Sequence, residues 1–213
     1  MYKTETMQIL EELVARYPSL AAEKQNVYQA FVMLQTAIAA KKRIYLCGNG
    51  GSASDCEHIV GELMKSFKKH RPLPAEFCEK LKEYGEEGEA LADGLEGGMP
   101  AVSLCGQIAF NTAFSNDRNP ALTFAQGVSS LGESGDVLLT LSTSGNSQNC
   151  IYAAIVAKAK DMKVLFLGGG TGGRLKGLAD VSVVVPEKET FKVQELHLPV
   201  YHCLCAMLEN ENF

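Results

Sequence analysis

Apolar and polar positions follow a helical period through the N-terminal part of the chain. Residues 5–22 and 24–41 place their apolar side chains three and four positions apart, which gathers them on one face of a helix. In the second stretch this face consists of Val27, Phe31, Leu34 and Ile38. The pattern predicts a helical arm over residues 1–41, which either covers its own sheet or packs against another subunit.

Short apolar runs follow the arm and predict strands, because glycine, asparagine and serine bound them and helical stretches separate them. The predicted strands are residues 43–47, 100–104, 136–141, 163–167 and 181–185. The predicted helices are residues 53–67, 107–115, 122–131, 148–160 and 194–209, with a turn at residues 116–117. Alternating strands and helices predict an α/β fold, a doubly wound, mostly parallel sheet flanked by helices.

Residues 74–98 interrupt this alternation. They contain eight acidic residues, two lysines and five glycines, so their net charge is 2 − 8 = −6. The spacing of Phe77, Leu81 and Tyr84 predicts one short amphipathic helix, and the remainder is typical of a solvated surface insertion. We expect a single domain over residues 1–213 that carries this insertion.

Composition narrows the class of protein. The chain has 213 residues, 46% of them hydrophobic, and a formal net charge of −5, which disfavours a nucleic-acid or membrane partner. The first seven residues contain no apolar signal segment, and no apolar run reaches the roughly 20 residues of a membrane span. The seven cysteines are odd in number and form no CxxC pair, which predicts reduced thiols and a cytoplasmic location.

Loops rich in glycine and serine follow two of the predicted strands. Residues 48–52 and residues 142–147 (STSGNS) each precede a predicted helix, whose N-terminal N–H groups favour an anion. Either loop alone is equally consistent with an ordinary helix N-cap. Both follow parallel strands and therefore lie at one edge of the sheet, where together they favour a phosphate monoester. The dinucleotide and P-loop motifs are absent from the sequence.

Two helices carry candidate acid–base and metal-binding groups. His58 and Glu62 are four residues apart and share a helix face, although such a pair alone is more often a surface ion pair. Gln194 and His202 lie in the apolar closing helix, and the four side chains form a plausible Zn²⁺ set. Gln194 and His202 are roughly 12 Å apart along a regular helix, so sharing one ion requires an irregular helix start or another subunit. His197 faces elsewhere and is interpreted as structural.

Several stretches together resemble the sugar isomerase (SIS) domain family. They are CGNGGSASDCEHIVGEL at 47–63, SND at 115–117, GDVLLTLSTSGNS at 135–147 and VQELHLPVYH at 193–202. The resemblance implies a flavodoxin-like sandwich, and a homotetramer with active sites at subunit contacts. It also implies one Zn²⁺ per subunit, approached by His58, Glu62, Gln194 and His202.

The resemblance also implies a substrate site and a reaction. Asn49, Gly50, Gly51, Asn116 and Asp117 would meet a sugar, with Glu62 and Gln194 also in contact, and its phosphate would be held by Ser52, Ser142, Thr143, Ser144 and Ser147. The expected reaction converts sedoheptulose 7-phosphate to D-glycero-D-manno-heptose 7-phosphate through an enediol in carbohydrate metabolism, with Glu62 as base and His202 as acid. The alternatives are another sugar phosphate, or a non-catalytic tetrameric scaffold that binds the replication initiator.

The chain departs from the family pattern at two places. The acidic insertion separates an Arg-Pro turn from the second predicted strand, where the family usually continues directly. Phe191 stands where many of the isomerases have an aspartate. The first departure follows the helix that bears Glu62, so the insertion could affect the mouth of the site. At the second place, Phe191 has no carboxylate, so any contact that the aspartate makes in those isomerases is in doubt here.

Overall fold

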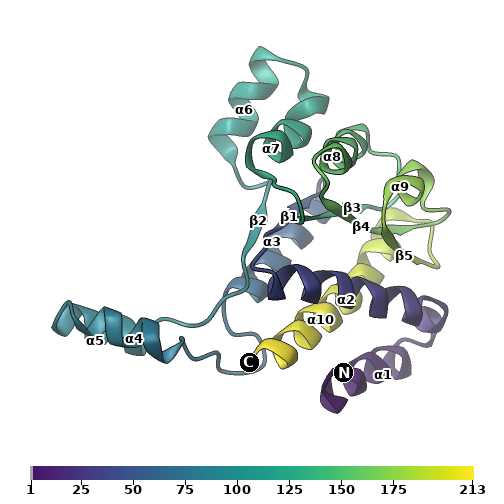
Figure 1. The fold of residues 1–213 in the computed structure, drawn as a ribbon. Coiled ribbons are helices and arrows are strands. Elements are labelled where there is room, and N and C mark those ends of the chain that lie inside the picture. The colour runs from purple at the N-terminus through teal and green to yellow at the C-terminus, as the bar shows by residue number, and fades with distance from the viewer. Residues whose placement is uncertain (1) are drawn as a thin grey trace.

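Five parallel strands form one sheet in the order β2-β1-β3-β4-β5 in the computed structural model, which describes residues 2–213 (Figure 1). The strands are β1 (Ile44–Cys47), β2 (Ala101–Ser103), β3 (Val137–Ser142), β4 (Lys163–Gly169) and β5 (Val181–Val185). The chain leaves β1 toward β2 and returns to β3 on the other side. The predicted doubly wound parallel sheet is therefore confirmed, and its topological switch point lies between β1 and β3.

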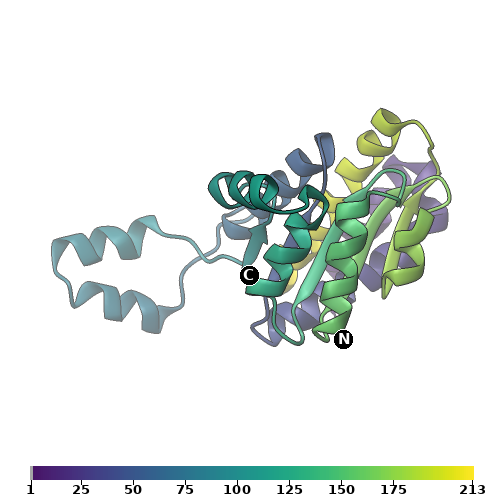
Figure 2. The same ribbon diagram turned by 90° about the horizontal axis from the view of Figure 1, so that it is seen from above.

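Helices cover both faces of the sheet (Figure 2). One face packs against α2 (Lys24–Ala39), α3 (Gly51–Met64) and α10 (Thr190–Asn212), and the other against α7 (Thr123–Leu131) and α8 (Gln148–Ala159). Two cores form because successive side chains of a strand point to opposite faces of the sheet. In β1, Ile44 and Leu46 pack in the first core, and Tyr45 and Cys47 pack in the second. Three further helices lie around the sheet, α1 (Thr4–Arg16), α6 (Ile108–Asp117) and α9 (Gly173–Leu178), and 3-10 turns occur at Pro18–Glu23 and Pro120–Leu122.

Several element boundaries differ from those predicted. The first arm helix ends at Arg16, since Pro18 begins a 3-10 turn, and α1 packs against α10 of its own chain. Residues 116–117 are the last two residues of α6 rather than a turn. The closing helix begins at Thr190, so Gln194 lies within the helix and an irregular start does not shorten its distance to His202.

The acidic insertion forms two helices, α4 (Ala75–Lys82) and α5 (Glu86–Gly94), that project from the body as a hairpin (Figures 1 and 2). The predicted amphipathic helix corresponds to α4, whereas α5 was not predicted. Gly85 takes a φ of +73° before α5, and three glutamates in the first turn of α5 suit the positive end of its dipole. A Cβ at Gly88 would lie 1.8 Å from the Leu81 carbonyl oxygen, so a glycine is required where the two helices meet.

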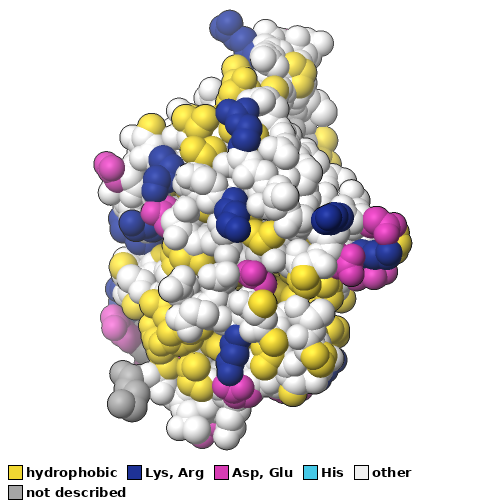
Figure 3. All heavy atoms as spheres, turned by 90° about the vertical axis from the view of Figure 1, so that its right-hand side faces the viewer, with side chains coloured by type: hydrophobic (Ala, Val, Ile, Leu, Met, Phe, Trp, Pro, Cys, Tyr) yellow, Lys and Arg dark blue, Asp and Glu magenta, His cyan; other side chains and the backbone are white. Residues whose placement is uncertain are grey.

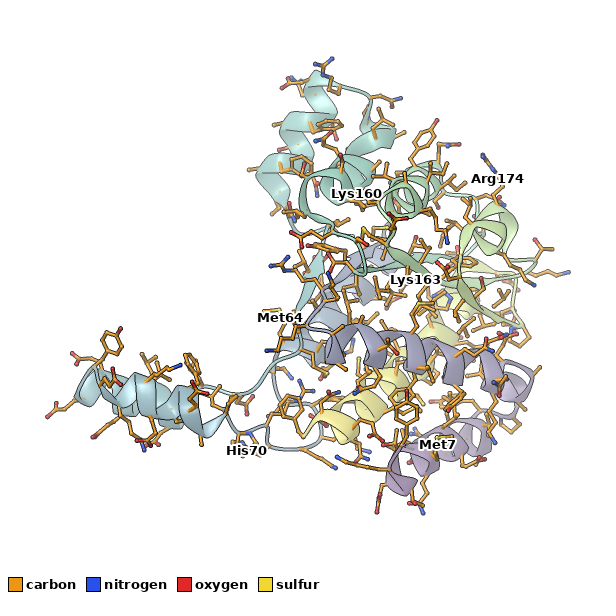
Figure 4. The ribbon with its side chains drawn as sticks, viewed as in Figure 1. Met7, Met64, His70, Lys160, Lys163 and Arg174 are labelled. Carbon is orange, nitrogen blue, oxygen red and sulfur yellow. The ribbon has the colours of Figure 1, made fainter. Side chains whose placement is uncertain are left out.

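A buried ion pair anchors the base of the hairpin. Arg71 is fully buried, and its Nε lies 2.8 Å from Glu209 Oε1 of α10. Its other nitrogens donate to the carbonyl oxygens of Leu63 and Glu62 at the end of α3, both at 2.8 Å. Arg71 thereby ties α3 to α10. His70 lies beside it at the junction between hairpin and body (Figure 4).

Two features of the described residues bear on a membrane or nucleic-acid partner. Within residues 2–213, no helix combines the length and apolar character needed to cross a membrane. Figure 3 shows Lys and Arg side chains scattered among acidic and apolar ones on the face that includes α8 and α9. That distribution differs from the clustered basic patch typical of a nucleic-acid-binding face.

Candidate active site

The first glycine loop joins β1 to α3 at the switch point of the sheet. β1 and β3 are paired in register, with Cys47 opposite Thr140, so the loops after both strands emerge at one edge. A Cβ at Gly48 would lie 2.7 Å from the Ser52 carbonyl oxygen, and Gly50 takes a φ of +56°. Only glycine allows this tight turn, which directs the N-terminus of α3 toward the second loop.

The second loop, residues 142–147, is held against the glycine cluster that follows β4. Gly145 has a φ of +66°, and a Cβ there would lie 1.9 Å from the Gly172 carbonyl oxygen. The Ser142 and Ser147 hydroxyls are 3.0 Å apart and bond each other, and Ser147 makes no side-chain cap on α8. The simple N-cap interpretation of Ser147 is therefore wrong, and both hydroxyls are arranged beside a helix N-terminus.

Asn49 connects the two loops through a partner that the sequence did not single out. Its amide and that of Asn149 at the start of α8 donate to each other, with distances of 3.0 and 2.8 Å. Both line a cavity of about 300 Å³ together with Gly50 and Ser115. Asparagine is common at helix starts, so nothing in the sequence indicated that the Asn149 side chain would bond to Asn49.

The other predicted sugar and phosphate residues are not among those that line this cavity. Ser52 is buried in the first turn of α3, and Thr143 and Ser144 lie in the second loop. Asn116 and Asp117 are exposed at the end of α6, where the Asn116 amide donates to the carboxylate of Asp117 at 3.0 Å. They lie outside the lining of the cavity that contains Asn49.

Glu62 and His202 meet through His58, although 140 residues separate them in the sequence. His58 Nε2 lies 3.3 Å from Glu62 Oε1 on the same face of α3 and 3.4 Å from His202 Nε2 on α10. The Glu62 side chain is 13% exposed, and Lys65 Nζ lies 3.5 Å from its other oxygen. The packing of α10 across α3 thus brings the predicted acid and base into one cluster.

A buried hydrogen-bond chain sets the orientation of His58. The Tyr201 hydroxyl lies 3.3 Å from Asp55 Oδ1 and 3.1 Å from His58 Nδ1. A hydroxyl that donates to Asp55 can accept a hydrogen bond from the Nδ1–H of His58, and this contact turns the Nε2 of the ring toward Glu62. Burial raises the pKa of Tyr201, so the hydroxyl keeps its proton. Asp55 and Tyr201 were missed, since nothing in the sequence pairs them.

His202 lies at the edge of a groove of about 360 Å³ between α1 and α10. Burial and the neighbouring His58 lower the pKa of His202, while the Glu62 carboxylate opposes them. The imidazole of His202 is therefore neutral at pH 7 and available as a hydrogen-bond donor. Phe67 lies against its ring, with centroids 5.5 Å apart.

The donor set fits a metal ion in part. Glu62 Oε1 and His58 Nε2 are both atom types that bind Zn²⁺, and they lie 3.3 Å apart. Two ligands of a tetrahedral zinc, each about 2.0–2.1 Å from the ion, lie about 3.3–3.4 Å apart, close to the separations found here. Within residues 2–213, however, no three His, Cys, Asp or Glu side chains lie close enough together to hold a metal ion.

Gln194 lies away from this cluster within one chain. A Cβ at Gly51 would lie 2.6 Å from Gln194 Nε2, which places the amide over the start of α3. His197 faces the interior, fully buried, with its Nε2 3.2 Å from the Gly168 carbonyl oxygen. The cavity lined by Asn49 contains neither Glu62 nor His202, and the groove that His202 borders contains no residue of either loop.

Comparison with known proteins agrees with these features. Residues 2–87 and 98–169 match the SIS domain family, and the gap between them, residues 88–97, falls within the acidic insertion. A phosphoheptose isomerase of Nitratiruptor is 36% identical over 184 residues, covering 86% of this chain and 85% of that protein. Another, of Leptospira biflexa, is 34% identical over 206 residues, covering 97% and 94%.

Solved structures give the same result. A phosphoheptose isomerase from Neisseria gonorrhoeae superposes with a TM-score of 0.72 at 28% identity, covering 96% of this chain and 93% of its own. One from Francisella tularensis gives a TM-score of 0.71 at 26% identity, covering 96% and 92%. The similarity therefore spans nearly the whole of each protein.

Proposed function

Because the chain belongs to the SIS domain family, we propose that it is an aldose–ketose isomerase that converts sedoheptulose 7-phosphate to D-glycero-D-manno-heptose 7-phosphate. The observation that carries the proposal is the meeting of Glu62 and His202 at His58, in a chain whose two phosphate-type loops share one edge of the sheet. An enediol mechanism needs these two groups, a base for a carbon-bound proton and a proton donor for the neighbouring oxygen.

Glu62 acts as the base and His202 as the acid. The Glu62 carboxylate removes a proton from C1 of the ketose while the His202 N–H protonates the carbonyl oxygen on C2, which gives an enediol. Return of a proton to C2 and loss of the proton from the C1 hydroxyl give the aldose. A neutral imidazole suits this role, because the lowered pKa of His202 makes its N–H the donor at pH 7.

The phosphate group binds between the two loops. The hydroxyls of Ser52, Ser142, Thr143, Ser144 and Ser147 and the N-termini of α3 and α8 supply donors without a lysine. Asn49, Gly50 and Gly51 contact the sugar. Asn116 and Asp117 reach it only from the end of α6. The anchored phosphate fixes the position of C1 and C2, which is the source of much of the rate enhancement in such reactions.

We also propose that Zn²⁺ binds to His58, Glu62, Gln194 and His202. The separations of the His58, Glu62 and His202 donor atoms support this set, and Gln194 is its least supported member. When bound, the ion would polarise the substrate carbonyl. Elemental analysis of purified protein is expected to find about one zinc per chain, and His58→Ala is expected to lose it.

A homotetramer is part of the proposal, with subunit contacts completing each active site. The support is that Asn49 and Gly50 of the first loop line one cavity of the chain, whereas His202 borders a separate, open groove beside α1. We place the protein in the cytoplasm, where its seven free cysteines stay reduced.

Steady-state kinetics of two variants test the proposal. Glu62→Gln keeps size and hydrogen bonding but removes the base, and His202→Asn keeps a donor but removes the imidazole. Each is expected to lower kcat on sedoheptulose 7-phosphate by about 10²–10⁴-fold with little change in KM. His70→Ala, at the hairpin base, is the control and should match the wild type. Wild-type kcat in both site variants would refute the assignment, and no turnover by the wild-type protein would favour a non-catalytic scaffold.

A further inference from the structure

Two asparagine side chains line the cavity of about 300 Å³, and the proposed reaction uses only one of them. Asn49 belongs to the first glycine loop, and Asn149 is the second residue of α8, two positions after Ser147. Their amides exchange two hydrogen bonds, from Asn49 Nδ2 to Asn149 Oδ1 at 3.0 Å and from Asn149 Nδ2 to Asn49 Oδ1 at 2.8 Å. The pair therefore presents two joined amides to the same cavity.

A backbone donor fixes the direction in which the Asn149 amide faces. The Cys150 N–H donates to Asn149 Oδ1 at 3.0 Å. A backbone N–H cannot accept a hydrogen bond, so the atom of the amide that faces it is the oxygen and not the nitrogen. Because the same oxygen also receives the side chain of Asn49, that side chain must turn its nitrogen toward it. The orientation of both amides follows from the one backbone contact.

A count of donors and acceptors shows which groups of the pair are left for a ligand. An amide has two N–H groups and an oxygen with two lone pairs. Asn149 Oδ1 uses both lone pairs, on Asn49 and on the Cys150 N–H, and Asn49 uses both N–H groups, on Asn149 and on the Cys150 sulfur atom at 3.7 Å. Within residues 2–213 neither side chain makes a further hydrogen bond. One N–H of Asn149 and one lone pair of Asn49 Oδ1 remain, on atoms 2.8 Å apart.

The other amide and hydroxyl side chains of the cavity have their hydrogens engaged within the protein. Thr123 Oγ1 lies 2.8 Å from a carbonyl oxygen, to which it donates, and 3.2 Å from Ser115 Oγ, from which it then accepts. Asn111 uses both N–H groups on carbonyl oxygens at the end of β2 and just after it, each at 3.0 Å. Of the amide and hydroxyl side chains that line the cavity within the described residues, Asn149 therefore keeps a hydrogen free for a ligand.

The two remaining groups suit a ligand that both accepts and donates hydrogen bonds. A phosphate monoester at pH 7 carries about −1.5 to −2 charges and mainly accepts, so it would leave Asn49 Oδ1 unpaired and repelled. An ammonium group only donates, so it would leave the Asn149 N–H unpaired. Hydroxyl groups do both. The pair is therefore suited to the hydroxyl-bearing chain of a sugar phosphate and not to its phosphate.

We propose that Asn149 is a further substrate-binding residue, and that it and Asn49 bind hydroxyl groups of the sugar chain. One hydroxyl oxygen accepts the free Asn149 N–H, and one hydroxyl group donates to Asn49 Oδ1. The assignment rests on the proposed function, because it takes the ligand to be a sugar phosphate. A ligand without hydroxyls would leave both amide groups unpaired, so the pair selects polyhydroxylated phosphates.

Calorimetric titration with two probes tests the pair. Inorganic phosphate carries only the anionic group, whereas D-glucitol 6-phosphate adds a chain of hydroxyls and has no carbonyl group to isomerise. The wild type is expected to bind D-glucitol 6-phosphate at least about tenfold more tightly than inorganic phosphate, and Asn149→Ala to lose about tenfold for D-glucitol 6-phosphate but less than about twofold for inorganic phosphate. Equal losses for the two probes would show a merely structural role. That result, or no loss for either probe, would overturn the proposal.

A neighbouring amide provides the matched control. Gln148→Ala truncates the preceding side chain of α8, which does not line the cavity, and should bind both probes as the wild type does. Thermal melting shows whether Asn149→Ala folds. If it does not, Asn149→Ser, which keeps an oxygen atom for the Cys150 N–H, takes its place. Equal affinities of the wild type for the two probes would overturn the proposal without any variant.

Turnover measured in parallel separates this proposal from the proposed function. Asn149→Ala should raise the KM for sedoheptulose 7-phosphate about tenfold with little change in kcat, because the acid–base groups lie on α3 and α10. A wild type that binds D-glucitol 6-phosphate through Asn149 but does not turn over sedoheptulose 7-phosphate would support the pair and count only against the isomerase. Turnover by Asn149→Ala with the wild-type KM would count only against the pair.

Discussion

At the scale of single residues, local spacing predicted the site only in part. His58 and Glu62 were found because four residues make one helical turn, and the structure places their side chains 3.3 Å apart. The contact of His202 with His58 depends on how α10 crosses α3, which no local pattern reports. Asn149 and Tyr201 were missed for the same reason, since their roles arise from partners distant in sequence.

His197 provides a prediction at this scale. Burial lowers its pKa to about 4, against 6.5 for an exposed histidine, so between these values the unfolded chain binds more protons than the folded one. Stability therefore falls as the pH is lowered from 6.5 toward 4, by at most about 3 kcal/mol from this residue. His197→Gln, which cannot titrate, is expected to lose less stability over that range in denaturant titrations. Equal losses in the two proteins would contradict this account.

At the scale of elements, apolar periodicity predicted every strand of the sheet to within a few residues. It did so because parallel strands covered on both faces are continuous apolar runs. It failed in the insertion, where α5 carries few apolar residues and is formed by its acidic first turn and its contact with α4. Boundaries also moved where a cap or proline decided them, as at Pro18.

The α4–α5 hairpin gives a prediction for a whole element. α4 has no buried residue and α5 buries only Gly88, so the hairpin adds little to the core. Its two ends already meet, because the Gly97 N–H donates to the Arg71 carbonyl oxygen at 2.7 Å. Replacing residues 74–95 by a short Gly-Ser linker is expected to change the free energy of unfolding by less than about 1 kcal/mol. Arg71→Met, by contrast, should cost about 3–5 kcal/mol, because it leaves Glu209 buried and unpaired.

Chemical denaturation of both proteins checks this contrast. A hairpin deletion as damaging as Arg71→Met would show that α4 and α5 support the body of the protein. The comparison also distinguishes the contribution of Arg71 to stability from that of the hairpin, because Arg71 binds α3 and α10 directly.

At the scale of the whole molecule, different features of the fold position the two kinds of chemistry. The switch point between β1 and β3 determines where the phosphate-type loops lie. The crossing of α3 and α10 brings together the side chains of the Glu62–His58–His202 cluster. The sequence predicted that both loops lie at one edge of the sheet, because each follows a parallel strand. That Asn49 and His202 line different cavities could not be predicted, because it depends on side-chain packing between elements.

Exchange of substrate hydrogen with solvent tests the central claim most directly. The protein is incubated with sedoheptulose 7-phosphate in D₂O, and proton NMR follows deuterium entering C1 of the ketose and C2 of the aldose. The wild type is expected to incorporate deuterium at both carbons, and Glu62→Gln to slow incorporation by at least about 10²-fold while substrate still binds. Incorporation by Glu62→Gln at the wild-type rate would contradict the role of this carboxylate as the base.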